Sequence, residues 1–334
     1  MKKSAFIKLL TAGLCILFFS ICLTDCKKPD NKLKYPKGTF PDTLINITDI
    51  NSTYDDYNSA LLQINQDIPI VFSSNRQSSG GQFDLEQGII SYTFDQTTGV
   101  FGFSSRMTTD AFLTKLISKA KTPGNDFGPY RLFSTVDGYE YLMLSSVNTQ
   151  GNLDLYYLKN QPVAGTTIPE ITGPLPVKLM NTGSDDAYIC FNATQDTAYF
   201  SSNKGGNFDI YYLTKPAEKD LSSWFNLDYV LPVKEDSLNS SAEDKCPFIL
   251  KNIMVFASNR PGGLGGYDLY YSILKNGKWS SPVNMGPRIN TSADEYRPVL
   301  GYHPQFTNKY LIFSSNRPGG KGGFDLYFTG VDFP

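Results

Sequence analysis

One glycine-rich motif recurs five times along this chain. It reads "VFSSNRQSSGGQFDL" (71–85), "LSSVNTQGNLDLYY" (144–157), "FSSNKGGNFDIYY" (200–212), "FASNRPGGLGGYDLYY" (256–271) and "FSSNRPGGKGGFDLYF" (313–328). The aspartates of the motif are spaced by 70, 55, 59 and 57 residues; they are Asp84, Asp154, Asp209, Asp268 and Asp325. A self-similar unit of this length is typical of a propeller, a solenoid or an array.

The fourth unit shows what one repeat contains. Residues 243–250, 253–259, 267–274 and 278–286 form four strand-like runs that short polar or glycine-rich turns separate. In the third run, Tyr267 and Leu269 point to one face and Tyr270 to the other, so both faces of the sheet must be buried against other parts of the protein. A four-stranded antiparallel sheet packed between similar sheets provides that cover. We therefore predict an all-β fold, a five-bladed β-propeller.

A second recurring element precedes the first run of each unit. It covers residues 51–62, 122–132, 181–191, 239–249 and 290–300, so five headers match five motifs. The long first interval predicts an elaborated outer region of the first blade at 95–121, with a short helix. The last unit ends at Pro334 without a fourth run. Residues 40–57 align without a gap with 279–296, so we expect residues 40–50 to supply the missing strand and to close the ring.

The N-terminal residues have a different character. Residues 1–25 place three lysines before an apolar run from Leu9 to Leu23, which predicts an export signal. The end of that run, "LTDC", resembles the lipobox of bacterial lipoproteins, which implies lipidation at Cys26; simple cleavage is the alternative. Residues 26–38 read as a lysine-rich tether, and the propeller takes up 39–334. Without residues 1–25 the formal net charge changes from −2 to −4, which argues against nucleic acid as a partner.

The motifs at 256–271 and 313–328 resemble the WD-like repeat of TolB-type β-propellers, which are common in exported bacterial proteins. The resemblance covers residues 39–334 and is specific for the fold rather than for the function. It implies a non-catalytic, lipid-anchored protein of the outer membrane or periplasm that binds other envelope proteins. The alternative is a propeller that binds or cleaves glycans.

The glycines and the aspartate of the motif suggest a structural role. Glycine allows the positive φ angles of a tight turn, and the aspartate can accept hydrogen bonds from the N–H groups of that turn. Five equivalent aspartates favour a need of the fold over a single catalytic site. The five are Asp84, Asp154, Asp209, Asp268 and Asp325.

Charged side chains cluster in the headers and turns, which a propeller places on the same end of the ring. We expect a rim of alternating charge, which either forms salt bridges within itself or binds a partner. The cations are Arg76, Lys204, Arg260 and Arg317, and the acids are Asp55, Asp56, Asp126, Asp185, Asp186, Glu243, Asp244, Asp294 and Glu295.

Residues suited to other chemistry are few. His303 is the only histidine and falls in a turn; no zinc spacing or nucleophile elbow occurs, so we expect no cofactor and no metal. A glycosidase would need carboxylates outside the repeat pattern, and the candidates are Asp110, Glu140, Glu170 and Asp228. Cys190 and Cys246 fall two positions apart in aligned strands, so we expect two buried free thiols rather than a disulfide.

Overall fold

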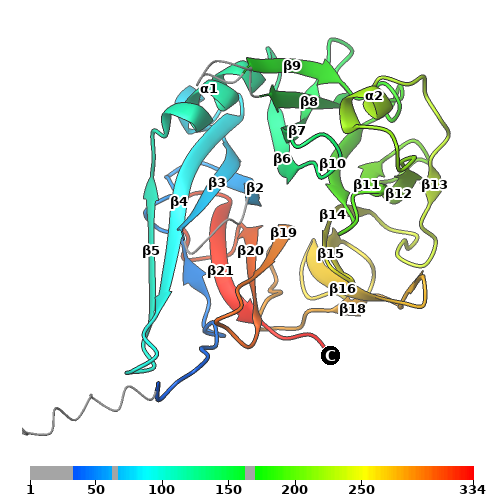
Figure 1. Cartoon of the computed structure of the whole chain (residues 1–334). Helices are drawn as coiled ribbons and strands as arrows, with labels where there is room; N and C mark the ends of the chain where they lie inside the picture. The colour runs from blue at the N-terminus through cyan, green and yellow to red at the C-terminus, as the bar shows by residue number, and fades with distance from the viewer. Residues whose placement is uncertain (1–32, 62–66, 162–169) are drawn as a thin grey trace, which may run out of the picture.

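The computed structural model describes residues 33–61, 67–161 and 170–334, and these form five antiparallel sheets arranged around a common centre (Figure 1). The fold class predicted from the repeats is therefore confirmed. The predicted export signal and Cys26 lie outside the described residues. Within the described ranges, no helix has the length and hydropathy needed to cross a membrane.

The first two blades follow the chain directly from the inner to the outer strand. Blade 1 contains β2 (Asp56–Leu61), β3 (Asp67–Ser74), β4 (Asp84–Phe94) and β5 (Phe101–Met107). Blade 2 contains β6 (Asp126–Phe133), β7 (Glu140–Val147), β8 (Leu153–Gln161) and β9 (Glu170–Pro176). The surplus of the first unit forms β5 and α1 (Ala111–Ala120), as expected, and a 3₁₀ turn, η1 (Arg76–Ser78), follows β3.

The other three blades have shorter outer strands. Blade 3 contains β10 (Asp186–Phe191), β11 (Thr197–Ser202), β12 (Asp209–Thr214) and β13 (Val233–Lys234), with α2 (Leu221–Phe225) before β13. Blade 4 contains β14 (Asp244–Leu250), β15 (Ile253–Ser258) and β16 (Asp268–Lys275), and its outer strand is split into β17 (Lys278–Trp279) and β18 (Val283–Asn284). Blade 5 contains β19 (Glu295–Tyr302), β20 (Lys309–Ser315), β21 (Asp325–Val331) and β1 (Ile45–Asn46).

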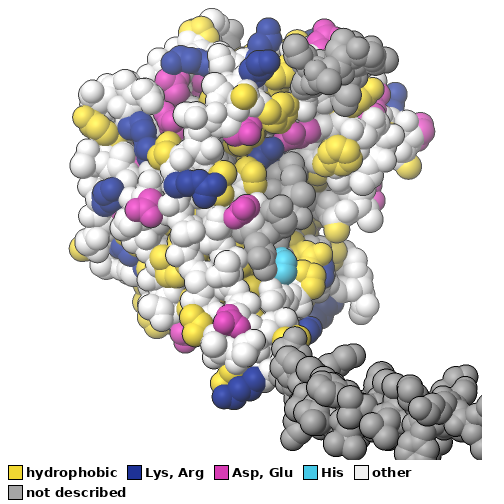
Figure 2. All heavy atoms as spheres, turned by 60° about the vertical axis from the view of Figure 1, so that its left-hand side comes forward, with side chains coloured by type: hydrophobic (Ala, Val, Ile, Leu, Met, Phe, Trp, Pro, Cys, Tyr) yellow, Lys and Arg dark blue, Asp and Glu magenta, His cyan; other side chains and the backbone are white. Residues whose placement is uncertain are grey.

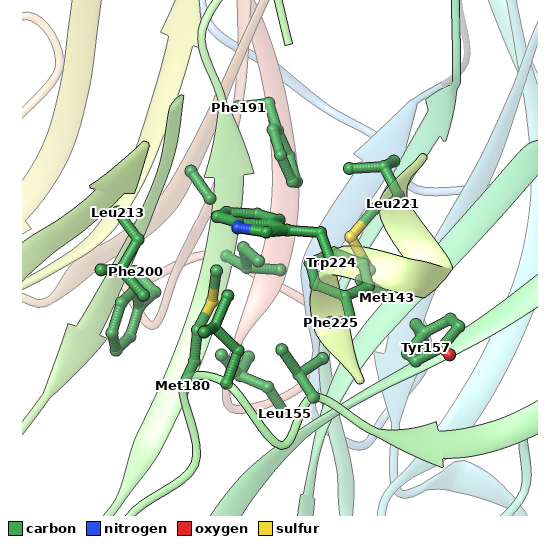
Figure 3. Packing of buried hydrophobic residues seen from close by; sticks show 14 of the residues in the cluster. Met143, Leu155, Tyr157, Met180, Phe191, Phe200, Leu213, Leu221, Trp224 and Phe225 are labelled. Atoms are coloured by element: carbon green, nitrogen blue, oxygen red, sulfur yellow. The ribbon is translucent and has the colours of Figure 1, made fainter. Parts of the chain in front are cut away.

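The hydrophobic core lies between the blades, because both faces of each sheet are apolar. Between blades 2 and 3, Met143 and Tyr157 pack against Phe191, and α2 adds Trp224 and Phe225 (Figure 3). All five side chains are at most 3% exposed. Burial of this kind contributes about 25 cal/mol per Å² of apolar surface, so the ring is stabilised wherever two blades meet.

The N-terminal segment closes the ring as the alignment predicts. In β1, Ile45 pairs with Phe328 and Asn46 pairs with Tyr327 of β21, so the outer edge of β21 in the last blade is covered. Phe40 is buried and stacks on Phe306 at 3.8 Å between ring centroids. We call residues 38–50 the latch.

All five inner strands share one irregularity. The pairing with the second strand shifts after the second residue of β2, β6, β10, β14 and β19, which is the signature of a β-bulge. The third residue of each strand has a positive φ of 46° to 60°; these residues are Asn58, Gly128, Tyr188, Cys246 and Arg297. In every blade the third residue of the inner strand is therefore left out of the pairing with the second strand.

The two cysteines among the described residues lie in inner strands and are free thiols. Cys190 and Cys246 are fully buried, and Cys246 occupies the same bulge position as Tyr188. This confirms the register expected from the aligned headers.

The surface turned toward the viewer in Figure 2 mixes charges of both signs. Lysine and arginine side chains alternate with aspartate and glutamate, and apolar side chains are scattered singly between them. No extended patch of one charge forms on the side shown.

The latch yields the first prediction. Phe40→Ala removes a buried ring from the contact between the first and last blades, so the free energy of unfolding should fall by about 3–5 kcal/mol. Leu33→Ala is the control, because Leu33 is 51% exposed and should change stability little. Urea unfolding of both variants measures the difference.

Deleting residues 39–50 tests the same closure more severely. The deletion exposes the edge of β21 and should unfold or aggregate the protein. A truncated protein that remains monomeric with unchanged melting would show that the latch does not close the ring.

Candidate functional site

A hollow of about 290 Å³ opens at the end of the central channel where the inner strands begin. Its walls come from blades 1, 3, 4 and 5; the lining residues are Asp55, Tyr57, Phe83, Tyr188, Tyr267, Asp294, Tyr296 and Phe324. We call this hollow the channel mouth. Concave sites with aromatic walls and a few polar groups are the usual form of a ligand site.

The aromatic side chains of the channel mouth pack on one another in a partial ring. Tyr57 lies edge-on to Phe83 at 5.1 Å and stacks against Phe324 at 5.6 Å. Tyr267 meets Tyr296 edge-on at 5.3 Å. These contacts fix the orientation of the rings, because edge and offset arrangements are the favourable ones. The mouth therefore presents preformed apolar faces.

A lysine and a glutamate stand beside these rings. Lys245 Nζ lies 2.7 Å from Glu243 Oε2 and 4.5 Å from the centre of the Tyr267 ring. The hydroxyl of Tyr267 donates a hydrogen bond to the same Glu243 oxygen. Burial acts to raise the pKa of Glu243, but the hydrogen bonds from Lys245 and Tyr267 outweigh it and lower the pKa. Glu243 is therefore ionised at neutral pH.

Tyr267 itself stays protonated. Burial, followed by the hydrogen bond to Glu243, raises the pKa of its hydroxyl far above the usual range. The pair thus provides one fixed donor and one fixed negative charge at the edge of the channel mouth.

Asp55 and Asp294 join neighbouring blades at the channel mouth. Asp55 Oδ1 accepts the N–H of Phe324, and Asp294 Oδ1 accepts the N–H of Tyr267, each at 2.8 Å. Asn125 and Asp185 occupy the same repeat position and make the same bond, to Phe83 and Leu153. An asparagine therefore satisfies the structural requirement of this position as well as an aspartate does.

The cations expected at a charged rim are instead largely buried within their own blades. Arg76 pairs with Asp56, Arg260 with Asp244, and Arg317 with Glu295, and the three acids are fully buried. The guanidinium groups also donate to backbone carbonyls of the preceding connection, those of Ile50, Leu238 and Ile289. The arrangement is one buried ion pair in each of blades 1, 4 and 5 rather than an exposed ring.

Blade 3 departs from this arrangement. Lys204 stands where blades 1, 4 and 5 have arginine, and its Nζ lies 4.3 Å from the Tyr211 ring without a hydrogen-bond partner among the described residues. Burial lowers the pKa of Lys204. Asp186 has no arginine partner among the described residues and accepts the N–H and the hydroxyl of Thr182.

The aspartates of the recurring motif bind their own turns in the last two blades. Asp268 accepts the N–H groups of Leu264 and Gly265, and Asp325 accepts those of Lys321 and Gly322. In blades 1 and 3 the aspartate instead forms an ion pair with a lysine: Asp84 pairs with Lys121, and Asp209 pairs with Lys234. Asp154 has neither partner in the part of the chain that the structure describes, and one of its oxygens is unpaired.

The acids proposed from outside the repeat pattern lie away from the channel mouth. Asp110 caps α1 by accepting the N–H of Leu113, and Glu140 pairs with Arg131. Glu170 and Asp228 are exposed on the outer part of the ring. His303 lies in the turn between β19 and β20. Among the described residues, no three His, Cys, Asp or Glu side chains come together as metal ligands.

The aromatic walls were the feature that sequence reasoning missed. Phe83, Tyr267 and Phe324 each stand directly before the aspartate of the recurring motif. The strand pattern assigns Tyr267 only to a face of the sheet, whereas the place of all three residues directly before the third strand brings them to the channel mouth.

No protein-family model matches this chain, and no curated protein matches its sequence. Solved structures resemble it in fold. An endo-arabinase from Bacteroides thetaiotaomicron is 11% identical with a TM-score of 0.53, over 89% of this chain and 98% of that chain. An α-L-arabinofuranosidase from Podospora anserina is 11% identical with a TM-score of 0.50, over 90% and 98%. An exo-β-1,3-galactanase from Phanerochaete chrysosporium is 13% identical with a TM-score of 0.50, over 87% and 65%.

These comparisons correct two expectations. The resemblance to TolB-type propellers is wrong, because no family model supports it and the structures of similar fold belong to glycoside hydrolases. The expectation of a non-catalytic scaffold that binds proteins through its rim is corrected as well, because the solved structures of similar fold carry the names of enzymes that act on glycans.

The buried ion pairs yield a second prediction. Arg260→Met leaves the Asp244 carboxylate buried without its cation, so the free energy of unfolding should fall by about 3–5 kcal/mol. Lys204→Met is the matched control at the same repeat position. It removes no ion pair and should leave stability unchanged or slightly raised. Equal losses in the two variants would show that the arginine pair does not stabilise the blade.

Proposed function

We propose that this protein acts on carbohydrate, binding a glycan at the channel mouth and cleaving a glycosidic bond there. The observation that carries the proposal is the combination of preformed aromatic faces with ionisable carboxyl groups in one hollow of a five-bladed propeller. Sugar rings have apolar C–H faces that stack on aromatic rings, and hydroxyl groups that bond to carboxylates. Tyr57, Tyr267 and Tyr296 provide the first kind of contact, and Asp55 and Asp294 the second.

Cleavage of a glycosidic bond needs two carboxyl groups with different tasks, one that donates a proton and one that is ionised. Glu243 suits the ionised role, because its pKa is lowered. Asp294 is the candidate for the proton donor. It and Glu243 contact the two ends of the same residue, Tyr267, so they flank one side of the channel mouth.

The fold neighbours support the same substrate class. They carry the names of enzymes that act on arabinan, on arabinofuranosides and on β-1,3-galactan. Arabinan, a nitrophenyl arabinofuranoside and β-1,3-galactan are therefore the first substrates to test.

The third prediction concerns the carboxyl groups. Asp294→Asn and Glu243→Gln should each lower the rate of glycan cleavage by about 100-fold or more, because they remove proton transfer or the negative charge. Release of reducing sugar measures the rate. Asp294→Asn keeps the acceptor for the Tyr267 N–H, as Asn125 does for Phe83 in blade 2.

Asp185→Asn is the matched control. It makes the same change at the same repeat position, where Asp185 accepts the Leu153 N–H and does not line the channel mouth. The control should cleave glycans like the wild type and melt at the same temperature as Asp294→Asn. Wild-type rates in both Asp294→Asn and Glu243→Gln would refute the catalytic assignment, and no binding of any glycan would refute the proposed function.

A further inference from the structure

Below the channel mouth, Arg297 occupies the bulge position of β19. Its φ is 46°, and it is the largest side chain that is fully buried. The four equivalent positions hold Asn58, Gly128, Tyr188 and Cys246. The guanidinium reaches across the channel from blade 5 to blade 2, where Nη2 donates to the carbonyl of Pro129 at 3.1 Å and to that of Gly128 at 3.4 Å.

The rest of the guanidinium has no hydrogen-bond acceptor among the described residues. Nε and Nη1 are both buried and unpaired, and together they carry three of the five N–H donors of an arginine. The Tyr188 ring lies 5.6 Å from the guanidinium carbon and contributes a cation–π contact. That contact satisfies none of the free N–H groups.

Among the described residues, no acidic side chain forms an ion pair with Arg297. Burial raises the pKa of the Cys246 thiol to about 11 and that of the Tyr188 hydroxyl far above its usual range, so both stay neutral. A buried charge without a partner is strongly destabilising, so the site calls for a counter-ion.

A second unpaired donor lies at the same level. Asn58 is fully buried, and neither atom of its amide makes a hydrogen bond of ordinary geometry. The amide does lie within hydrogen-bonding reach of the hydroxyls of Tyr57 and Tyr188, and this contact acts to lower the pKa of both. Asn58 and Arg297 therefore both border Tyr188, and Arg297 keeps N–H groups without acceptors among the described residues.

We propose that a small monovalent anion, a halide or a small carboxylate such as formate, binds in the central channel on the free N–H groups of Arg297, with Asn58 as a second donor. The anion neutralises the buried guanidinium and occupies the axis of the ring beside Tyr188. Because Tyr188 also lines the channel mouth, the bound anion holds one wall of that hollow in place.

The test compares melting temperatures of the wild type in sodium gluconate, sulfate, chloride, bromide and formate at equal ionic strength. We expect a saturable rise of roughly 5 °C with the anion that fits and none with sulfate. A rise with chloride and bromide identifies a halide site, and a rise with formate alone identifies a carboxylate site. Identical melting in all five salts would overturn the proposal.

Two variants separate the channel site from general salt effects. Arg297→Met should lose the anion-dependent rise, whereas Arg106→Met, at an exposed position in β5, should keep it. A rise that survives in Arg297→Met overturns the proposal. If Arg297→Met does not fold, crystals of the wild type grown with bromide decide the matter, since anomalous density beside the guanidinium supports the site and its absence, together with unchanged melting in formate, refutes it.

Discussion

Each inner strand begins with a buried carboxylate, and the stability of the ring depends on the hydrogen bonds and ion pairs that this carboxylate forms. In every blade the carboxylate accepts the N–H and the hydroxyl of a serine or threonine four residues earlier. In three blades a buried arginine adds an ion pair. One side chain thereby ties the incoming connection, the inner strand and the turn after the second strand together. This fixed geometry positions the residues next to it, which include every acid of the channel mouth.

The sequence allowed the fold to be predicted because the repeat records a need that recurs in each blade. The spacing of the motif gave the number of blades, and the alignment of residues 40–57 with 279–296 located the latch. The burial of the charged residues could not be predicted from the repeat. A repeat shows that Arg76 and Asp56 recur in a turn and at a strand start, but only packing decides that the guanidinium turns inward to the Ile50 carbonyl.

The candidate site was harder to predict for two physical reasons. The bulge in the inner strands has no sequence signal, because four of its five positions hold Asn58, Tyr188, Cys246 and Arg297 rather than glycine. The repeated motif also reflects the structure of a blade, and propellers of different families share that structure. The motif therefore indicated the wrong family. The proposed function rests on the channel mouth, whose aromatic wall at Tyr267 contacts the ionised Glu243, rather than on the motif.

The most direct test of this account is a crystal structure of the protein with a bound oligosaccharide, obtained with the Glu243→Gln variant to prevent turnover. The account predicts a sugar ring stacked on the aromatic walls of the channel mouth, with the bond to be cleaved beside Asp294. An oligosaccharide bound elsewhere on the ring, or a channel mouth that stays free of sugar at saturating concentration, would contradict it.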